Sequence, residues 1–193
     1  MKKHILIILI ILSSCKTSDD QNDFIPTLPL VTQTGENTFG CYIDGTLLTP
    51  RDGTGTLYGP DKAMDFIAGP SATNIYYYEL IAHDYKSIFN NRIDIHFVNL
   101  MENESQIFLI KSANCQYGLD ANHSINIRCK YNNNWYCSIN NSGVLSILKF
   151  NNQIISGTFE FTAQNINNSN DIIEITDGRF DINRYTVHTT IYP

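Results

Sequence analysis

The chain of 193 residues is short of positive charge. It has 13 lysine and arginine residues against 19 aspartate and glutamate residues, which gives a formal net charge of −6. The basic residues form no cluster, which argues against nucleic acid as a partner because phosphate neutralisation dominates that affinity. The same acidic balance argues against electrostatic docking of the protein surface on anionic lipid.

Sequence motifs of common enzymes are missing as well. The chain has no G-x-S-x-G, H-E-x-x-H or G-x-x-x-x-G-K motif. A cysteine-ligated metal is disfavoured because no C-x-x-C pair or matched histidine spacing occurs. Asp94 and His96, with Arg92 beside them, share one face of an expected strand and suit either an acid–base or metal site or a merely wet face. We therefore expect a non-enzymatic protein with no catalytic residue, metal or other cofactor.

The first fifteen residues have the pattern of a lipoprotein export signal. Two lysines precede an unbroken apolar run at 5–12, which is too short to cross a bilayer because a spanning helix needs about 20 residues. Residues 12–15, Leu-Ser-Ser-Cys, resemble a lipobox, in which the chain is cut before the cysteine and the cysteine is acylated. This pattern predicts a signal peptide at 1–14 and a membrane anchor at Cys15.

Residues 15–37 are polar, contain two prolines and lack any sustained period, so they are expected to form the lipidated cysteine and a flexible tether. Residues 16–20, Lys-Thr-Ser-Asp-Asp, resemble the basic-then-acidic signal that sends Bacteroidota lipoproteins to the outside of the outer membrane. The alternative is a merely solvated tether. The first interpretation predicts a lipid-anchored outer-membrane protein at the cell surface, and the second leaves a periplasmic orientation open.

Residues 38–193 are predicted to form one domain made of strands. Ile93, Ile95 and Phe97 alternate with polar neighbours, and no window has a helical apolar period. Expected strands cover 39–43, 46–49, 74–83, 92–98, 106–110, 125–131, 135–139, 144–150, 154–163, 172–176, 179–182 and 186–191. The fold class is all-β, a single antiparallel β-sandwich or meander-barrel of about ten strands.

Both ends of this domain resemble a Bacteroidota lipoprotein family that is described only as a domain of unknown function. Residues 28–41, LPLVTQTGENTFGC, followed by Asp44-Gly45, match its opening segment. Residues 155–161, ISGTFEF, and 175–181, ITDGRFD, match the style of its end. The resemblance implies a fold and a cellular location, and it transfers no catalytic residue.

Four cysteines follow Cys15 and could form disulfides in an oxidising compartment. If Asn132–Asn134 form a three-residue turn, Cys129 lies opposite Cys137, within the distance that a disulfide requires. Cys41 and Cys115 would then pair by subtraction alone. The alternative is that some of the four are free, buried thiols.

Tyr131, Trp135 and Tyr136 are expected at the tip of the same hairpin. Exposed rings on a β-scaffold can stack on sugar faces, so this tip is a candidate binding surface for a glycan or a protein. The alternative is ordinary core packing. Two other functions stay open, a structural envelope protein without a dedicated ligand and a lipocalin-like carrier of a small apolar molecule.

Overall fold

The computed structural model describes residues 24–57, 59–70, 74–113, 115 and 124–193. They form one ten-stranded antiparallel sheet, so the expected all-β fold class is confirmed. A single 3-10 turn, η1 (Val187–Thr189), is the only helical element in these residues. The strands are β1 (Thr38–Ile43), β2 (Thr46–Leu48), β3 (Met64–Pro70), β4 (Tyr76–Asp84), β5 (Asn91–Val98), β6 (Gln106–Leu109), β7 (Asn126–Tyr131), β8 (Asn134–Phe150), β9 (Ile154–Asn165) and β10 (Asn168–Asn183).

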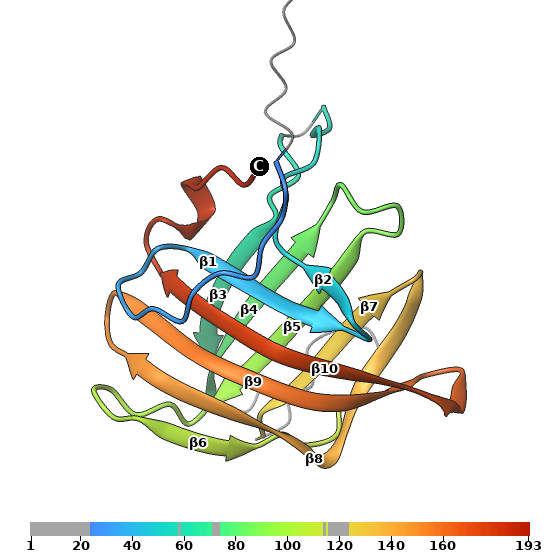
Figure 1. Ribbon diagram of the computed structural model, residues 1–193. Helices are drawn as coiled ribbons and strands as arrows, with labels where there is room; N and C mark the ends of the chain where they lie inside the picture. The colour runs from blue at the N-terminus through green and yellow to red at the C-terminus, as the bar shows by residue number, and fades with distance from the viewer. Residues whose placement is uncertain (1–23, 58, 71–73, 114, 116–123) are drawn as a thin grey trace, which may run out of the picture.

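The sheet curls on itself into a half-barrel, as Figure 1 shows. The strand order is β2-β1-β10-β9-β8-β7-β5-β4-β3, and β6 pairs with the far half of β8. The long strands β8 and β10 bend where register shifts interrupt their ladders, and such bulges increase local twist. The sandwich alternative therefore gives way to a single curled sheet. No helix in the described ranges is long and apolar enough to span a membrane.

Apolar side chains fill the inside of the curl. Ile93, Ile95 and Phe97 of β5 are completely buried there, and Phe39 and Phe150 join them from β1 and β8. Each such side chain contributes about 1.5–3 kcal/mol relative to exposure. The alternation seen in the sequence thus separates an inner face, which is the core, from an outer face, which carries the polar side chains.

Short turns with left-handed residues connect neighbouring strands. Asp44 and Gly45 have φ values of 47° and 75° and join β1 to β2, as the Asp-Gly pair predicts. Asn132 and Asn133 have φ values of 47° and 65° and join β7 to β8. The β7–β8 turn has two residues because Tyr131 pairs with Asn134, and this differs from the three-residue turn that we expected.

The strand β10 joins two segments that the sequence separates. Asp177, at φ 53°, and Gly178 form an irregularity in the ladder with β9 and do not end the strand. A side-chain carbon on Gly178 would lie 2.4 Å from the ring of Phe159, so the close approach requires glycine. The expected strand at 186–191 is replaced by η1 and extended residues, and β3 was not predicted at all.

The described residues before β1, 24–37, are bound to the domain, whereas the composition of residues 15–37 predicts a flexible tether. The buried carboxylate of Asp181 accepts hydrogen bonds from the Thr32 hydroxyl at 2.7 Å and from the backbone N–H groups of Thr34 and Gly35, both at 2.9 Å. Pro29 packs so tightly on Gly40 that a side-chain carbon there would lie 2.6 Å away. The two sequence segments that carry the family resemblance therefore meet in space, and the folded part begins before Thr38.

Candidate functional site

The disulfide joins Cys115 to Cys137, so the predicted Cys129–Cys137 and Cys41–Cys115 pairs are wrong. In the two-residue turn, Cys129 lies opposite Tyr136, and Cys137 lies opposite Arg128. A shift of one residue moves a side chain to the other face of a sheet, so Cys129 and Cys137 point to opposite faces. Cys129 and Cys41 are free thiols buried in the core. Burial raises the pKa of both thiols well above the usual range.

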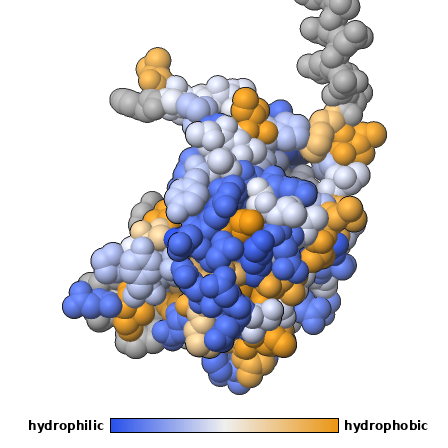
Figure 2. Space-filling view, turned by 90° about the vertical axis from the view of Figure 1, so that its left-hand side faces the viewer, coloured by the Kyte–Doolittle hydropathy of each residue, from blue (hydrophilic) through white to orange (hydrophobic). Residues whose placement is uncertain are grey.

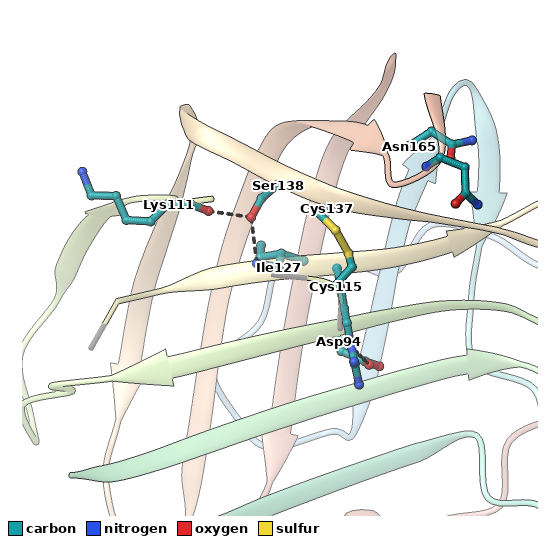
Figure 3. Close-up of a disulfide and its surroundings, with 9 residues drawn as sticks. Asp94, Lys111, Cys115, Ile127, Cys137, Ser138 and Asn165 are labelled. Atoms are coloured by element: carbon teal, nitrogen blue, oxygen red, sulfur yellow. Dashed lines mark hydrogen bonds and ion pairs between the residues drawn. A yellow bond between two sulfur atoms is a disulfide. The ribbon is translucent and has the colours of Figure 1, made fainter. Parts of the chain in front are cut away.

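Ser138 fixes the chain that leads to this disulfide. Its hydroxyl donates to the carbonyl oxygen of Lys111 at 2.6 Å and accepts from the N–H of Ile127 at 3.1 Å. The N–H of Ala113 donates to the Ser138 carbonyl at 3.0 Å. These bonds hold the segment against β8 and bring Cys115 to the outer face, on the same side as Asp94 (Figure 3).

The predicted aromatic surface of Tyr131, Trp135 and Tyr136 does not exist as one patch. Tyr136 is buried with the core, and its hydroxyl donates to Asp171 at 3.0 Å. The Tyr131 hydroxyl is hydrogen-bonded to Thr46 at 2.9 Å, where the end of β7 approaches the β1–β2 hairpin. Trp135 alone lies on the outer face, because adjacent residues of a strand point to opposite sides.

Trp135 belongs instead to a charged cluster on the outer face of β5, β7 and β8. Asp94, which is 3% exposed, accepts hydrogen bonds from Arg92 and from Arg128, the latter at 2.6 Å. The ring of Trp135 lies under both guanidinium groups, 5.1 Å from Arg128 and 6.0 Å from Arg92. A buried carboxylate between two cations holds both arginines in fixed positions.

A second buried pair continues this outer face. His96 Nδ1 lies 3.2 Å from Glu79 Oε1, and the His96 ring stacks on Tyr77 with centroids 5.4 Å apart. Burial raises the pKa of Glu79, and the hydrogen bond to His96 opposes that shift. The other polar atom of each side chain, Glu79 Oε2 and His96 Nε2, is buried without a hydrogen-bond partner in the described structure.

Beside Arg92 the outer face is hollowed. We call this cavity of about 330 Å³ the outer hollow; it is bordered by β3, β4, β5 and η1, and its polar lining comprises Lys62, Asp65, His83, Tyr85, Arg92 and His188. Its volume lies at the lower end of the range of about 300–1,000 Å³ that is typical of ligand pockets. The hollow is large enough for one small molecule.

The rings and charges of the outer hollow are preorganised. His83 and Tyr85 stack with centroids 4.6 Å apart and planes 4° from parallel. Burial, assisted by the charge of Arg92, lowers the pKa of His83 to about 4, so this ring is neutral at pH 7. Its buried Nδ1 has no partner among the described atoms. His188 of η1 lies 2.9 Å from Asp65 of β3 and closes one side.

The arrangement is suited to binding an organic ligand rather than a metal ion. In the part of the chain that the structure describes, no three histidine, cysteine, aspartate or glutamate side chains are placed to hold a metal ion. Asp94 and His96 do share one face, as their spacing predicts, but each is occupied by its own partner. Fixed cations, neutral imidazole and stacked rings can bind a polar ligand that also has an apolar face.

A second hollow of about 270 Å³ lies on the outer face of β8, β9 and β10. Glu160, Asp177 and Arg179 line it, and Arg179 is already engaged by Asp177 at 3.2 Å and by the Pro29 carbonyl oxygen. This hollow has no stacked ring pair beside fixed charges. The outer hollow is therefore the stronger candidate.

Sequence reasoning missed Glu79, Arg128, His83 and Tyr85 as site residues. The alternation in β5 and β7 does place Arg128 and Asp94 on polar faces, but it gives no strand order. Asp94 lies directly opposite Arg128 only because β5 pairs with β7. A pairing between segments that are more than thirty residues apart has no local sequence signature.

No family model, no curated protein and no solved structure matches this chain.

Proposed function

We propose that this protein is a non-enzymatic lipoprotein, anchored through acylated Cys15 on the outside of the outer membrane, that binds a saccharide in the outer hollow. The observation that carries the binding proposal is the stacked His83–Tyr85 pair beside the fixed cation of Arg92. Sugars present an apolar ring face together with hydroxyl groups, and they need both kinds of contact. The anchor rests on the lipobox and on the residues that follow it.

The fixed geometry around Arg92 favours recognition of hydroxyl groups. Because Asp94 and Trp135 hold this guanidinium, little side-chain entropy is lost when a ligand binds. The neutral ring of His83 lines the hollow beside this guanidinium. Ile81 supplies an apolar wall of the hollow.

The outer location of the hollow favours this function over the two alternatives. A lipocalin-like carrier holds its ligand inside the curl, where the described apolar side chains form one core cluster. A purely structural envelope protein would need no preorganised hollow on its surface. Neither alternative explains why the Arg92–Asp94 ion pair and the buried His96–Glu79 pair are maintained next to it.

Binding can be tested by ligand-detected NMR with a panel of neutral and acidic monosaccharides and disaccharides. We expect saturation transfer to at least one saccharide and its loss in Tyr85→Ala, which removes the stacked ring. Tyr185→Ala is the matched control, because Tyr185 is exposed and does not line the hollow. Equal binding by both variants, or no transfer across the panel, would contradict a saccharide site here.

The anchor has a separate test. Cys15→Ala should release the protein from washed membranes without unfolding the domain, because acylation needs the cysteine thiol. Protease added to intact cells should remove the domain from the unsubstituted protein if it lies outside the cell. Protection from protease would favour a periplasmic orientation, and membrane retention of Cys15→Ala would refute the lipid anchor.

A further inference from the structure

One end of the domain exposes apolar side chains on three neighbouring segments. Leu57, between β2 and β3, is 101% exposed; Ile88, between β4 and β5, is 92% exposed; and Ile191, near the C-terminus, is 82% exposed. Phe89 adds a partly exposed ring next to Ile88. The space-filling view shows apolar groups protruding at this upper end, above a mainly polar side of the molecule (Figure 2).

The three segments are joined to one another by hydrogen bonds. The N–H of Arg51 donates to the His83 carbonyl at 3.1 Å, and the N–H of Tyr85 donates back to the Arg51 carbonyl, also at 3.1 Å. Asp52 and Tyr192 are linked in the same way, with the Asp52 N–H donating to the Tyr192 carbonyl at 3.2 Å and the Tyr192 N–H donating to the Asp52 carboxylate at 3.1 Å. The exposed apolar side chains thus project from one connected end.

The described chain begins at this same end. The segment that starts at Phe24 descends from the top of the view in Figure 1, beside the C-terminus, and then runs down to β1. Eight residues lie between Cys15 and Phe24, so nine Cα–Cα steps join the two. Nine steps span at most about 32 Å when fully extended, and a flexible coil of that length would have a root-mean-square span of about 17 Å. A lipid on Cys15 therefore keeps this end of the domain close to the bilayer.

We propose that the end formed by Leu57, Ile88, Phe89 and Ile191 docks into the headgroup region of the bilayer and fixes the orientation of the domain. This inference rests on the proposed anchor at Cys15. Apolar side chains on loops can enter the boundary between headgroups and acyl chains. Because the chain is acidic overall, it is not attracted to anionic headgroups, and the apolar side chains make the contact without anionic lipid. The β6 end then points away from the membrane (Figure 1).

Tryptophan quenching measures this docking in the full-length, acylated protein. The chain has a single tryptophan, Trp135, so its own signal can be subtracted. Leu57→Trp and Ile88→Trp would each be reconstituted on phosphatidylcholine vesicles that carry bromine atoms in the upper acyl chain. Ile107→Trp is the matched control, because Ile107 is an exposed apolar residue of β6 at the far end of the domain.

We expect bromine to quench at least half of the added fluorescence in Leu57→Trp and Ile88→Trp, and to leave Ile107→Trp close to its value on unbrominated vesicles. Vesicle flotation reports the anchor independently. A protein that floats but shows equal quenching at all three positions overturns the docking and leaves the anchor intact. A protein that does not float refutes the anchor and, with it, the docking.

Discussion

The disulfide gives the sharpest test of the structure, because the sequence and the structure assign different partners to Cys137. The Cys115–Cys137 link spans 22 residues. The chain-entropy relation for a loop of that length gives about 3.4 kcal/mol of stabilisation at room temperature. We therefore expect Cys115→Ala, Cys137→Ala and the double variant to lose the same amount, about 3 kcal/mol each, since all three remove one link.

Urea denaturation with and without a reducing agent measures this effect. Trp135 is the only tryptophan and lies two residues before Cys137, so its fluorescence follows the relevant part of the sheet. Reduction should lower the stability of the unsubstituted protein to the level of Cys137→Ala and should leave that variant unchanged. Cys129→Ala is the control, because its core thiol is free and this variant should keep its full sensitivity to reduction.

Peptide mapping under non-reducing conditions then identifies the partner directly. The structure requires Cys137 to be recovered joined to Cys115. If instead Cys129→Ala abolishes the sensitivity to reduction, or if Cys137 is recovered joined to Cys129, the two-residue turn between β7 and β8 is wrong. The outer-face arrangement of Trp135 would then be wrong as well, because one register places both residues.

Three further predictions concern stability. Asp181→Ala should lower the free energy of unfolding, measured by urea denaturation, by about 2–4 kcal/mol, because the charge-assisted hydrogen bonds to the N-terminal segment are lost. A loss below about 0.5 kcal/mol, as for a surface substitution, would contradict the role of these hydrogen bonds. The pKa of His83 is about 4 in the folded protein and 6.5 for an ordinary histidine, so the unfolded chain takes up the proton at a higher pH than the folded protein does. The free energy of unfolding should therefore be highest above about pH 6.5 and should fall by on the order of 2 kcal/mol toward pH 4. His83→Gln should lack this contribution to the pH dependence. Gly157→Ala should cost about 1–3 kcal/mol, because the added carbon would lie 2.4 Å from the Ser146 carbonyl oxygen and 2.7 Å from the Phe180 ring; a neutral effect in thermal unfolding would show that the ladder can shift.

The β7–β8 hairpin shows how far local patterns reach. Its position follows from the apolar strands and the three asparagines, and the structure confirms the hairpin. Its turn length does not follow, because Asn-Asn and Asn-Asn-Asn can both supply left-handed residues. A difference of one residue reverses the face of every side chain on one strand. The cysteine pairing and the aromatic surface were therefore mispredicted together.

The segment before β1 illustrates a different limit. Its prolines and polar residues are typical of a tether, and nothing local indicates a partner. Thr32 and Gly35 are held by Asp181, which lies almost 150 residues later in the chain. Through this contact the two ends of the domain bind each other. Composition alone cannot reveal a contact of that range.

The sequence by itself determined the all-β class, the core-facing side of regularly alternating strands such as β5, and the position of the β1–β2 and β7–β8 hairpins. These features depend on residues a few positions apart, because side-chain alternation and turn chemistry are local. Only the tertiary structure decided that the strands form one curled sheet, that Cys137 joins Cys115, and that the outer hollow lies beside the fixed Arg92. Those features depend on which distant strands pair, and that choice is made by the packing of the whole core.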